Sequence, residues 1–332
     1  MHKVNIRRWL QLLLVAGLCF GTLATTGAVG GAADPVQPTS APGKTAQSSP
    51  AEAVQELKEM PAQDTPVRPP VEPVTEVQPA PPSLTPEELG WLALPNARPD
   101  RLDRYIAWME AHPEDSEENA VLQVNMDQDQ EFYSLIWESA DPSSLTVLVN
   151  KHYTLPAGYI PELEALGKGY GSGSLRPEAA QAFRAMADGA RADGFSLRSV
   201  SAYRSYKTQK STYNRYLKQY KQSTVDTFSA RPGHSEHQTG LALDINVASI
   251  AAHFERTPAF AWLTEHCAQY GFILRYPQGR EDVTGYRFEP WHYRYVGTEA
   301  AKACMERQLT YEEYLALQPE KAFQAPTAAI VK

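Results

Sequence analysis

A proline-rich stretch near the N-terminus limits what this chain can fold into more than any other feature. Thirteen of the 26 prolines lie between Pro35 and Pro86, among Ser, Thr, Gln, Glu and Ala. Proline lacks the N–H group that helices and sheets use, and this stretch has too little aromatic or β-branched surface to offset the entropy of ordering. We predict a disordered linker over residues 34–88, with a ligand for a proline-binding partner as the alternative.

The residues before the linker have the order of an export signal. Lys3, Arg7 and Arg8 precede an apolar run that begins at Trp9, and small residues follow as far as Ala33. The run is close to the ~20 residues that span a bilayer. Residues 1–33 are therefore predicted to be a signal peptide or an N-terminal membrane anchor, and the rest of the chain to lie outside the cytoplasm.

Charge and cysteine content narrow the functional classes. The 31 basic and 39 acidic residues give a net charge of −8, which argues against a nucleic-acid partner. The three cysteines lack the C-x-x-C spacing of a zinc ribbon or redox motif, so any metal must be held by His and carboxylates. Cys267 and Cys304 fall on predicted helices and could form a disulfide or remain as two buried thiols.

Hydrophobic periodicity predicts one α+β domain after residue 88. Helices are expected around Leu102–Met109, over Pro177–Gly194, from Tyr206 onward, and over Pro258–Tyr270 and Thr298–Gln308. Strands are expected at Leu145–Val149, Ser196–Ser201, Leu241–Ile245, Phe272–Tyr276 and Trp291–Val296. These elements divide into a helical extension over residues 89–144, the main domain over 145–312 and a C-terminal tail over 313–332.

A group of tyrosines gives a further expectation about the core. Tyr213, Tyr216 and Tyr220, with Leu217, recur at helical spacing after Tyr206. We interpret them as an aromatic stripe facing the core rather than a surface on which a sugar stacks.

Two short segments carry the residues of a metal site. His237 lies at the end of a loop, Asp244 follows seven residues later within a predicted strand, and Glu289 and His292 are three residues apart. A catalytic zinc site takes three protein ligands and leaves a fourth position to water. His237, Asp244 and His292 would supply the ligands, and Glu289 would act as the general base.

Other interpretations of these residues remain open at this stage. A single histidine is more often structural than a ligand, and His234 competes with His237, although Pro232 and Gly233 place it in a loop. Asp244 could instead be a cap or an ion-pair partner, but a charge within an apolar strand needs a partner. The helical H-E-x-x-H motif is absent.

The same segments resemble the VanY-type D-alanyl-D-alanine carboxypeptidases. The resemblance covers about Leu145–Cys304, and its most specific parts are Ser201–Tyr206, Arg231–Ile245, Tyr270–Pro277, Glu281–Tyr286 and Glu289–Gly297. It implies a small antiparallel sheet flanked by helices, the Hedgehog/D,D-peptidase-like fold. It further implies Zn²⁺ on His237, Asp244 and His292.

The resemblance also implies roles for the neighbouring residues. Glu289 would be the catalytic base, and Arg204 would bind substrate and its developing oxyanion. Ser235 would line the pocket for the terminal residue, and Gln209, behind Arg204, would join the substrate-binding residues. The expected activity is removal of the terminal D-Ala from peptidoglycan stem peptides by a monomeric zinc metallopeptidase that is secreted or anchored to the membrane facing the cell wall.

Three alternatives stay open. An L,D-carboxypeptidase of the same superfamily would act on tetrapeptides with the same zinc ligands. A binding or signalling module could keep the zinc without turnover, although Glu289 weighs against that. A structural cell-wall protein would surround its metal fully with protein ligands, whereas only three are matched here.

Overall fold

The computed structural model describes residues 84–248 and 251–318. The predicted signal or anchor, nearly all of the predicted linker and the chain beyond residue 318 lie outside these ranges. Within them, no helix combines the length and apolar character needed to cross a membrane.

Four short helical segments precede the main domain. They are α1 (Pro86–Leu92), the 3-10 helix η2 (Pro99–Arg101), α2 (Leu102–Ala111) and α3 (Glu117–Asn125). The Thr85 side chain and the Glu88 carboxylate cap each other's backbone N–H groups, which starts α1 at Pro86. The chain is thus already helical in the last residues of the range predicted to be linker.

A four-stranded antiparallel sheet forms the centre of the main domain, in the order β5-β6-β8-β7. Its strands are β5 (Leu197–Ser201), β6 (Ala242–Val247), β8 (His292–Tyr295) and β7 (Phe272–Leu274). Two smaller pairs complete the strands: β1 (Trp137–Glu138) with β2 (Tyr153–Thr154), in parallel, and β3 (Glu164–Ala165) with β4 (Ser174–Leu175), antiparallel. This arrangement confirms the predicted α+β fold with a small antiparallel sheet.

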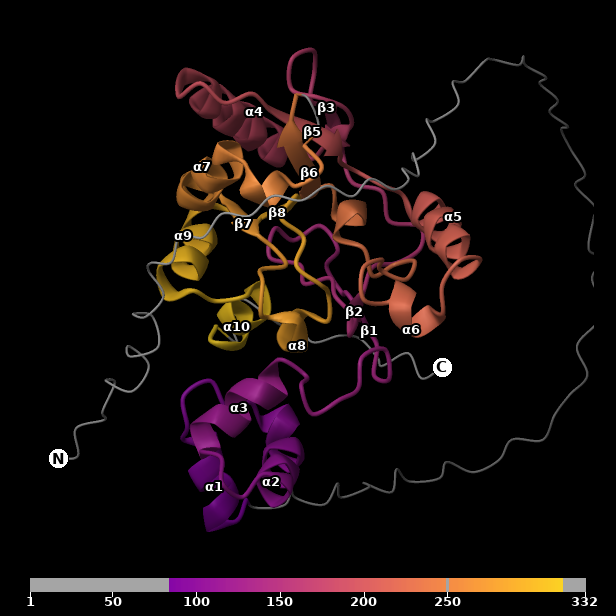
Figure 1. Cartoon of the computed structure of the whole chain (residues 1–332). Coiled ribbons are helices and arrows are strands. Elements are labelled where there is room, and N and C mark those ends of the chain that lie inside the picture. Colours follow the sequence, from indigo (N-terminus) through magenta and orange to yellow (C-terminus); the bar gives the residue numbers. More distant parts are fainter. Residues whose placement is uncertain (1–83, 249–250, 319–332) are drawn as a thin grey trace, which may run out of the picture. The chain divides into compact units, whose positions relative to one another are not determined.

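Helices flank the sheet. In Figure 1, α4, α7 and α9 lie to one side of the sheet, and α5 and α6 lie to the other. The longer helices are α4 (Pro177–Ala192), α5 (Tyr206–Leu217), α7 (Pro258–His266) and α9 (Thr298–Arg307). The shorter segments are α6 (Gln222–Val225), η3 (Glu236–Thr239), η4 (Phe254–Arg256), η5 (Cys267–Tyr270), α8 (Glu281–Thr284) and α10 (Tyr311–Ala316). The helix α10 extends into the range predicted to be a tail.

The main core joins α4 and α7 to the inner face of the sheet. Phe183 from α4, Leu263 from α7 and Leu243, Ile245 and Tyr293 from the sheet are fully buried in one cluster. Burying side chains of this size stabilises the fold by about 1.5–3 kcal/mol each. The core therefore holds β6 and β8 rigidly by one face.

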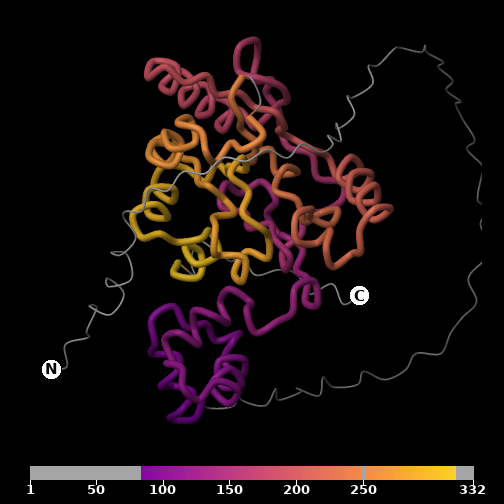
Figure 2. Tube along the Cα trace, in the orientation of Figure 1, coloured from indigo at the N-terminus to yellow at the C-terminus, as the bar shows by residue number. Residues whose placement is uncertain are grey.

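The predicted strand at Leu145–Val149 is wrong. This segment is buried at Val147, Leu148 and Val149 but pairs with no strand, and an arginine side chain takes the place of a strand partner at two of its carbonyls. Arg294 Nη2 donates to the carbonyls of Leu145, at 3.2 Å, and Val147, at 2.9 Å. In Figure 2 this magenta part of the trace runs among orange and yellow segments that come much later in the chain.

The predicted tyrosine stripe is wrong for two of its four members, Leu217 and Tyr220. Tyr213 is buried, but Leu217 and Tyr220 are 38% and 50% exposed. Tyr216 is half-buried and packs edge-on against Phe228, with 5.1 Å between ring centroids. The helix α5 ends at Leu217, so Tyr220 lies beyond it, and within α5 only Gln209 and Tyr213 are buried.

The two helical cysteines are free thiols. Cys267 and Cys304 are both buried, and no disulfide joins them. Of the two alternatives drawn from the sequence, the structure has the pair of buried thiols.

Candidate active site

The register of the central sheet places an aspartate beside a histidine. Asp244 of β6 pairs directly with His292 of β8, while the neighbouring pair of Leu243 and Tyr293 faces the core. Side chains alternate between the faces of a sheet, so Asp244 and His292 project together from the face opposite the core. Asp244 Oδ1 lies 3.3 Å from His292 Nδ1.

His237 reaches the same place from the 3-10 helix η3. Its Nδ1–H donates to the carbonyl of Ala202 at 2.7 Å, and the Arg204 backbone N–H donates to the carbonyl of His237 at 3.1 Å. η3 ends at Gly240, whose φ of 70° is a left-handed conformation that favours glycine. These contacts direct His237 Nε2 toward Asp244 Oδ1, 3.5 Å away.

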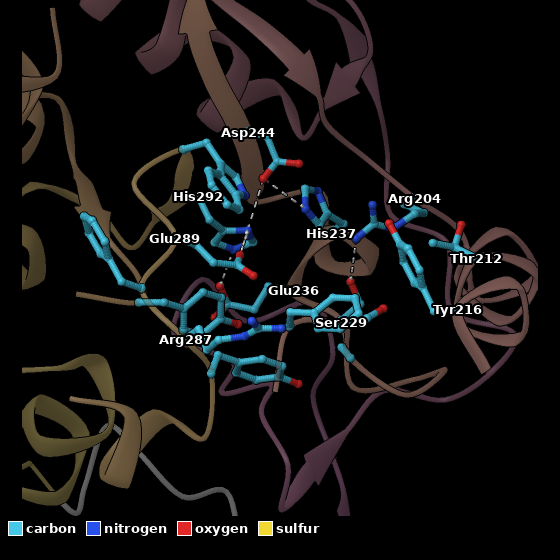
Figure 3. A pocket seen from close by; sticks show the side chains of 17 residues that line it. Arg204, Thr212, Tyr216, Ser229, Glu236, His237, Asp244, Arg287, Glu289 and His292 are labelled. Atoms are coloured by element: carbon cyan, nitrogen blue, oxygen red, sulfur yellow. Dashed lines mark hydrogen bonds and ion pairs between the residues drawn. The ribbon is translucent and has the colours of Figure 1, made fainter. Parts of the chain in front are cut away.

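The three side chains form a group suited to a metal ion. One ligand atom from each of His237, Asp244 and His292 lies within 4.8 Å of the others (Figure 3). Asp244 Oδ1 is buried and has no hydrogen-bond partner, and both histidines keep one nitrogen facing it. Two imidazole nitrogens and one carboxylate oxygen are a ligand set that Zn²⁺ takes, so the residues fit the metal.

The electrostatics of the group favour charge at Asp244. Burial would raise the pKa of Asp244, but His237 and His292 hold it well below its usual range. Burial lowers the pKa of His237, as does nearby Arg204. For His292 burial also acts to lower the pKa, but the nearby carboxylates of Asp244 and Glu236 outweigh this and raise it to about 9.

A buried ion network orients His292 from behind. Its Nε2–H donates to Glu236 Oε2 at 3.2 Å, and Glu236 Oε1 accepts from Arg275 Nε at 2.8 Å and Arg294 Nη1 at 3.0 Å. Arg275 is also bidentate to Glu312, at 2.6 and 2.8 Å. Despite complete burial, Arg275 and Arg294 hold the pKa of Glu236 well below its usual range. The network fixes which nitrogen of His292 faces Asp244.

Sequence reasoning missed this network. No role was assigned from the sequence to Glu236, Arg275 or Arg294. Arg275 falls in the predicted strand Phe272–Tyr276 and Arg294 in Trp291–Val296. A cation within a predicted strand is a signal that could have found them, because a buried charge needs a partner.

Glu289 lies beside the group without belonging to it. Its Oε2 is 3.9 Å from His292 Nδ1, and the side chain is largely buried. Burial is the main cause that raises the pKa of Glu289 to about 7, helped by Asp244 and opposed by His292, Arg204 and Arg287. A carboxylate of this pKa suits proton transfer near neutral pH.

Arg204 and Ser235 line the same cavity, whereas Gln209 does not. Arg204 Nη2 donates to Ser235 Oγ at 3.4 Å, and its buried Nε has no partner. Gln209 lies beneath the wall, where its Nε2 donates at 2.6 Å to the carbonyl of Ala230, a lining residue. The structure thus brings Arg204 and Ser235 to the metal group and leaves Gln209 as a support of the wall.

His234 takes no part in the group, in agreement with its demotion on sequence grounds. It is buried, and its ring nitrogen Nδ1 bonds to the carbonyl of Asn150 at 2.7 Å.

The cavity in front of the group has a volume of about 450 Å³, enough for part of a peptide. Its walls include aromatic residues that the sequence did not assign to a site: Tyr216, Phe228, Tyr276, Tyr286, Phe288 and Trp291. Arg287 is a second cation on the wall.

Three comparisons bear on the identity of the domain. Residues 172–298 match the model of the VanY family, described as D-alanyl-D-alanine carboxypeptidase. A D-alanyl-D-alanine carboxypeptidase of Enterococcus faecalis is 36% identical over 211 residues, covering 61% of this chain and 73% of that protein.

Among solved structures, the LdcB LD-carboxypeptidase is 39% identical with a TM-score of 0.51, covering 54% of this chain and 89% of that one. A vancomycin-resistance D,D-pentapeptidase VanY variant, in complex with Zn(II), is 37% identical with a TM-score of 0.46, covering 51% of this chain and 98% of that one.

Two histidines and an aspartate in the wall of a cavity, with a further carboxylate beside them, are the arrangement expected of a metal-dependent hydrolase. The chain belongs to the VanY family of D-alanyl-D-alanine carboxypeptidases. The predicted family and enzyme class are thus confirmed.

Proposed function

We propose that this protein is a zinc-dependent D-alanyl-D-alanine carboxypeptidase that removes the terminal D-Ala from peptidoglycan stem peptides. The observation that carries the proposal is that one nitrogen each of His237 and His292 faces a buried oxygen of Asp244 that accepts no hydrogen bond, in the wall of a cavity. Family membership supplies the reaction, and the ligand set supports zinc as the metal.

The proposal gives each residue a role that agrees with its position. When bound, zinc polarises the scissile carbonyl and lowers the pKa of its water toward ~7. Glu289 accepts a proton from the attacking water and returns it to the leaving amine nitrogen, a role that fits its pKa of about 7. Arg204 donates to the substrate carboxylate and to the developing oxyanion, and Ser235 borders the terminal residue.

An L,D-carboxypeptidase is the second candidate. The LdcB LD-carboxypeptidase is 39% identical to this chain, and the residues of the metal group do not separate the two activities. In that case the substrate would be a tetrapeptide, and the released residue would again be D-Ala.

The decisive experiment uses defined peptides. Purified protein is incubated with pentapeptide and tetrapeptide stems, with and without a chelator, and the released residue is identified by mass. We expect chelator-sensitive release of D-Ala from the pentapeptide. Release of D-Ala only from the tetrapeptide would favour the L,D-carboxypeptidase. No release from either peptide would favour the non-catalytic zinc module.

Such substrates lie outside the cytoplasmic membrane, so we also propose an extracytoplasmic location. The basic and apolar composition of residues 1–33 supports it, as secretion or as membrane anchoring.

A further inference from the structure

The cavity contains a second cation that the proposed chemistry does not use. Arg287 is exposed and lines the wall together with Arg204. Within residues 84–248 and 251–318, no carboxylate lies within ion-pair distance of the Arg287 guanidinium, and no hydrogen bond is made by its side chain. It is therefore a positive charge in a binding cavity with its donors free.

The position of Arg287 is held by its neighbours. Its guanidinium lies over the ring of Phe228 at 4.9 Å from the centroid, and its backbone N–H donates to the carbonyl of Thr227 at 3.0 Å. Tyr216 packs against the same Phe228 ring. A cation–π contact uses none of the N–H donors of the guanidinium in a hydrogen bond, so they can still bind a carboxylate.

The two arginines lie on different sides of the metal group. In Figure 3, Arg204 lies beyond His237, whereas Arg287 lies on the side of Glu289 and Glu236. With the terminal carboxylate of a substrate at Arg204 and the scissile bond at the metal group, the retained part of the peptide extends away from Arg204. Arg287 lines the part of the cavity that this retained segment of the peptide would occupy.

We propose that Arg287 binds a carboxylate on the retained part of the substrate and so selects stem peptides with a free acid at the second or third residue over their amidated forms. The inference rests on the proposed function and deepens it. Isoglutamate at the second position and diaminopimelate at the third each carry such a carboxylate, and amidation removes the charge while keeping the size. Arg287 would bind the same chemical group, a carboxylate, on either residue.

The test uses four synthetic pentapeptides. They carry isoglutamate and diaminopimelate as free acids, with either one amidated, or with both amidated. We expect kcat/KM of the wild-type protein to fall by about 10-fold on amidation of the recognised residue, mainly through KM. The singly amidated peptide that shows this loss identifies the source of the carboxylate.

Matched variants separate recognition from a general electrostatic effect. Arg287→Gln should remove the preference for the free acid, and Arg287→Lys should keep part of it. Arg198→Gln, at an exposed arginine of β5 outside the cavity lining, should keep all of it. An equal loss on all four peptides in Arg287→Gln, or equal wild-type rates on all four, would overturn the inference.

Equilibrium binding of the four peptides to the zinc-loaded protein is measured in parallel. If no D-Ala is released but the free acid binds more tightly in an Arg287-dependent way, the proposed function fails and the recognition stands. If D-Ala is released without any preference, the recognition fails and the proposed function stands.

Discussion

Replacing Glu236 with glutamine changes one buried charge and leaves the shape of the side chain almost intact. Glu236 accepts from Arg275 and Arg294 through one oxygen and from His292 Nε2–H through the other. With Glu312, the two arginines and two glutamates form a neutral, fully buried set. Glu236→Gln leaves this set with an excess positive charge.

Glu236→Gln should lower both the folding stability of the protein and its affinity for the metal. Breaking a buried pair by removing one partner costs about 3–5 kcal/mol of folding free energy. A glutamine also has only one acceptor oxygen, so its NH₂ group must face either the arginines or His292 Nε2–H, which are all donors. Facing two permanently charged arginines is the costlier choice, so the NH₂ group should face His292. The ring then loses the bond that fixes its metal-facing nitrogen, and metal affinity should fall by about 10- to 100-fold.

Glu312→Gln is the matched control. Glu312 binds the same Arg275 through both oxygens but makes no contact with His292. We expect both variants to lose stability in denaturant titrations, and only Glu236→Gln to lose zinc in competition with a chelator, measured where both proteins remain folded. Equal zinc affinity in the two variants would refute the role of Glu236 in orienting His292.

Three further predictions concern the base, the protons and the thiols. Glu289→Gln should keep the zinc and lower kcat by about 10²–10⁴, because the amide lacks the basic lone pair; near wild-type turnover with zinc bound would remove Glu289 from the mechanism. The pKa of His292 is raised from 6.5 to about 9, so a proton and zinc compete for its ring nitrogen. The apparent zinc affinity should therefore rise roughly tenfold per pH unit up to about pH 9, and calorimetry should detect proton release when zinc binds. A zinc affinity that does not change with pH would contradict this. In the metal-free protein the same raised pKa contributes stability that is fully present below about 6.5 and is lost as pH rises through about 9. Burial raises the pKa of Cys267 and Cys304 to about 12, so both thiols should react slowly in the native protein and rapidly in unreduced, denatured protein; failure to react after denaturation would indicate a disulfide.

Much of the fold could be predicted from the sequence because the signals are local. Proline at the first turn and glycine after the last predict the bounds of α4, which runs from Pro177 to Ala192 with Gly194 just beyond. The predicted helix ended by Gly271 is present as α7 followed by η5. Alternation or apolar runs located β5, β6, β7 and β8 to within one to two residues.

Sequence alone also singled out His237, Asp244, Glu289 and His292, since their types and spacing are those of a metal site. It could not show that they meet. Asp244 and His292 are nearly fifty positions apart and share a face only because β6 and β8 pair in this register. A shift of the pairing register by one residue would point the side chain of one of them toward the core.

The interpretations that failed depended on partners distant in the chain. Leu145–Val149 has the composition of a strand, but its carbonyls are taken by Arg294, a residue about 150 positions later. Glu236 had no assigned role until Arg275 and Arg294 were seen to enclose it. Residue type and local spacing determined the candidate ligands and most elements; pairing register and buried charge, which are set by long-range contacts, were decided only by the tertiary structure.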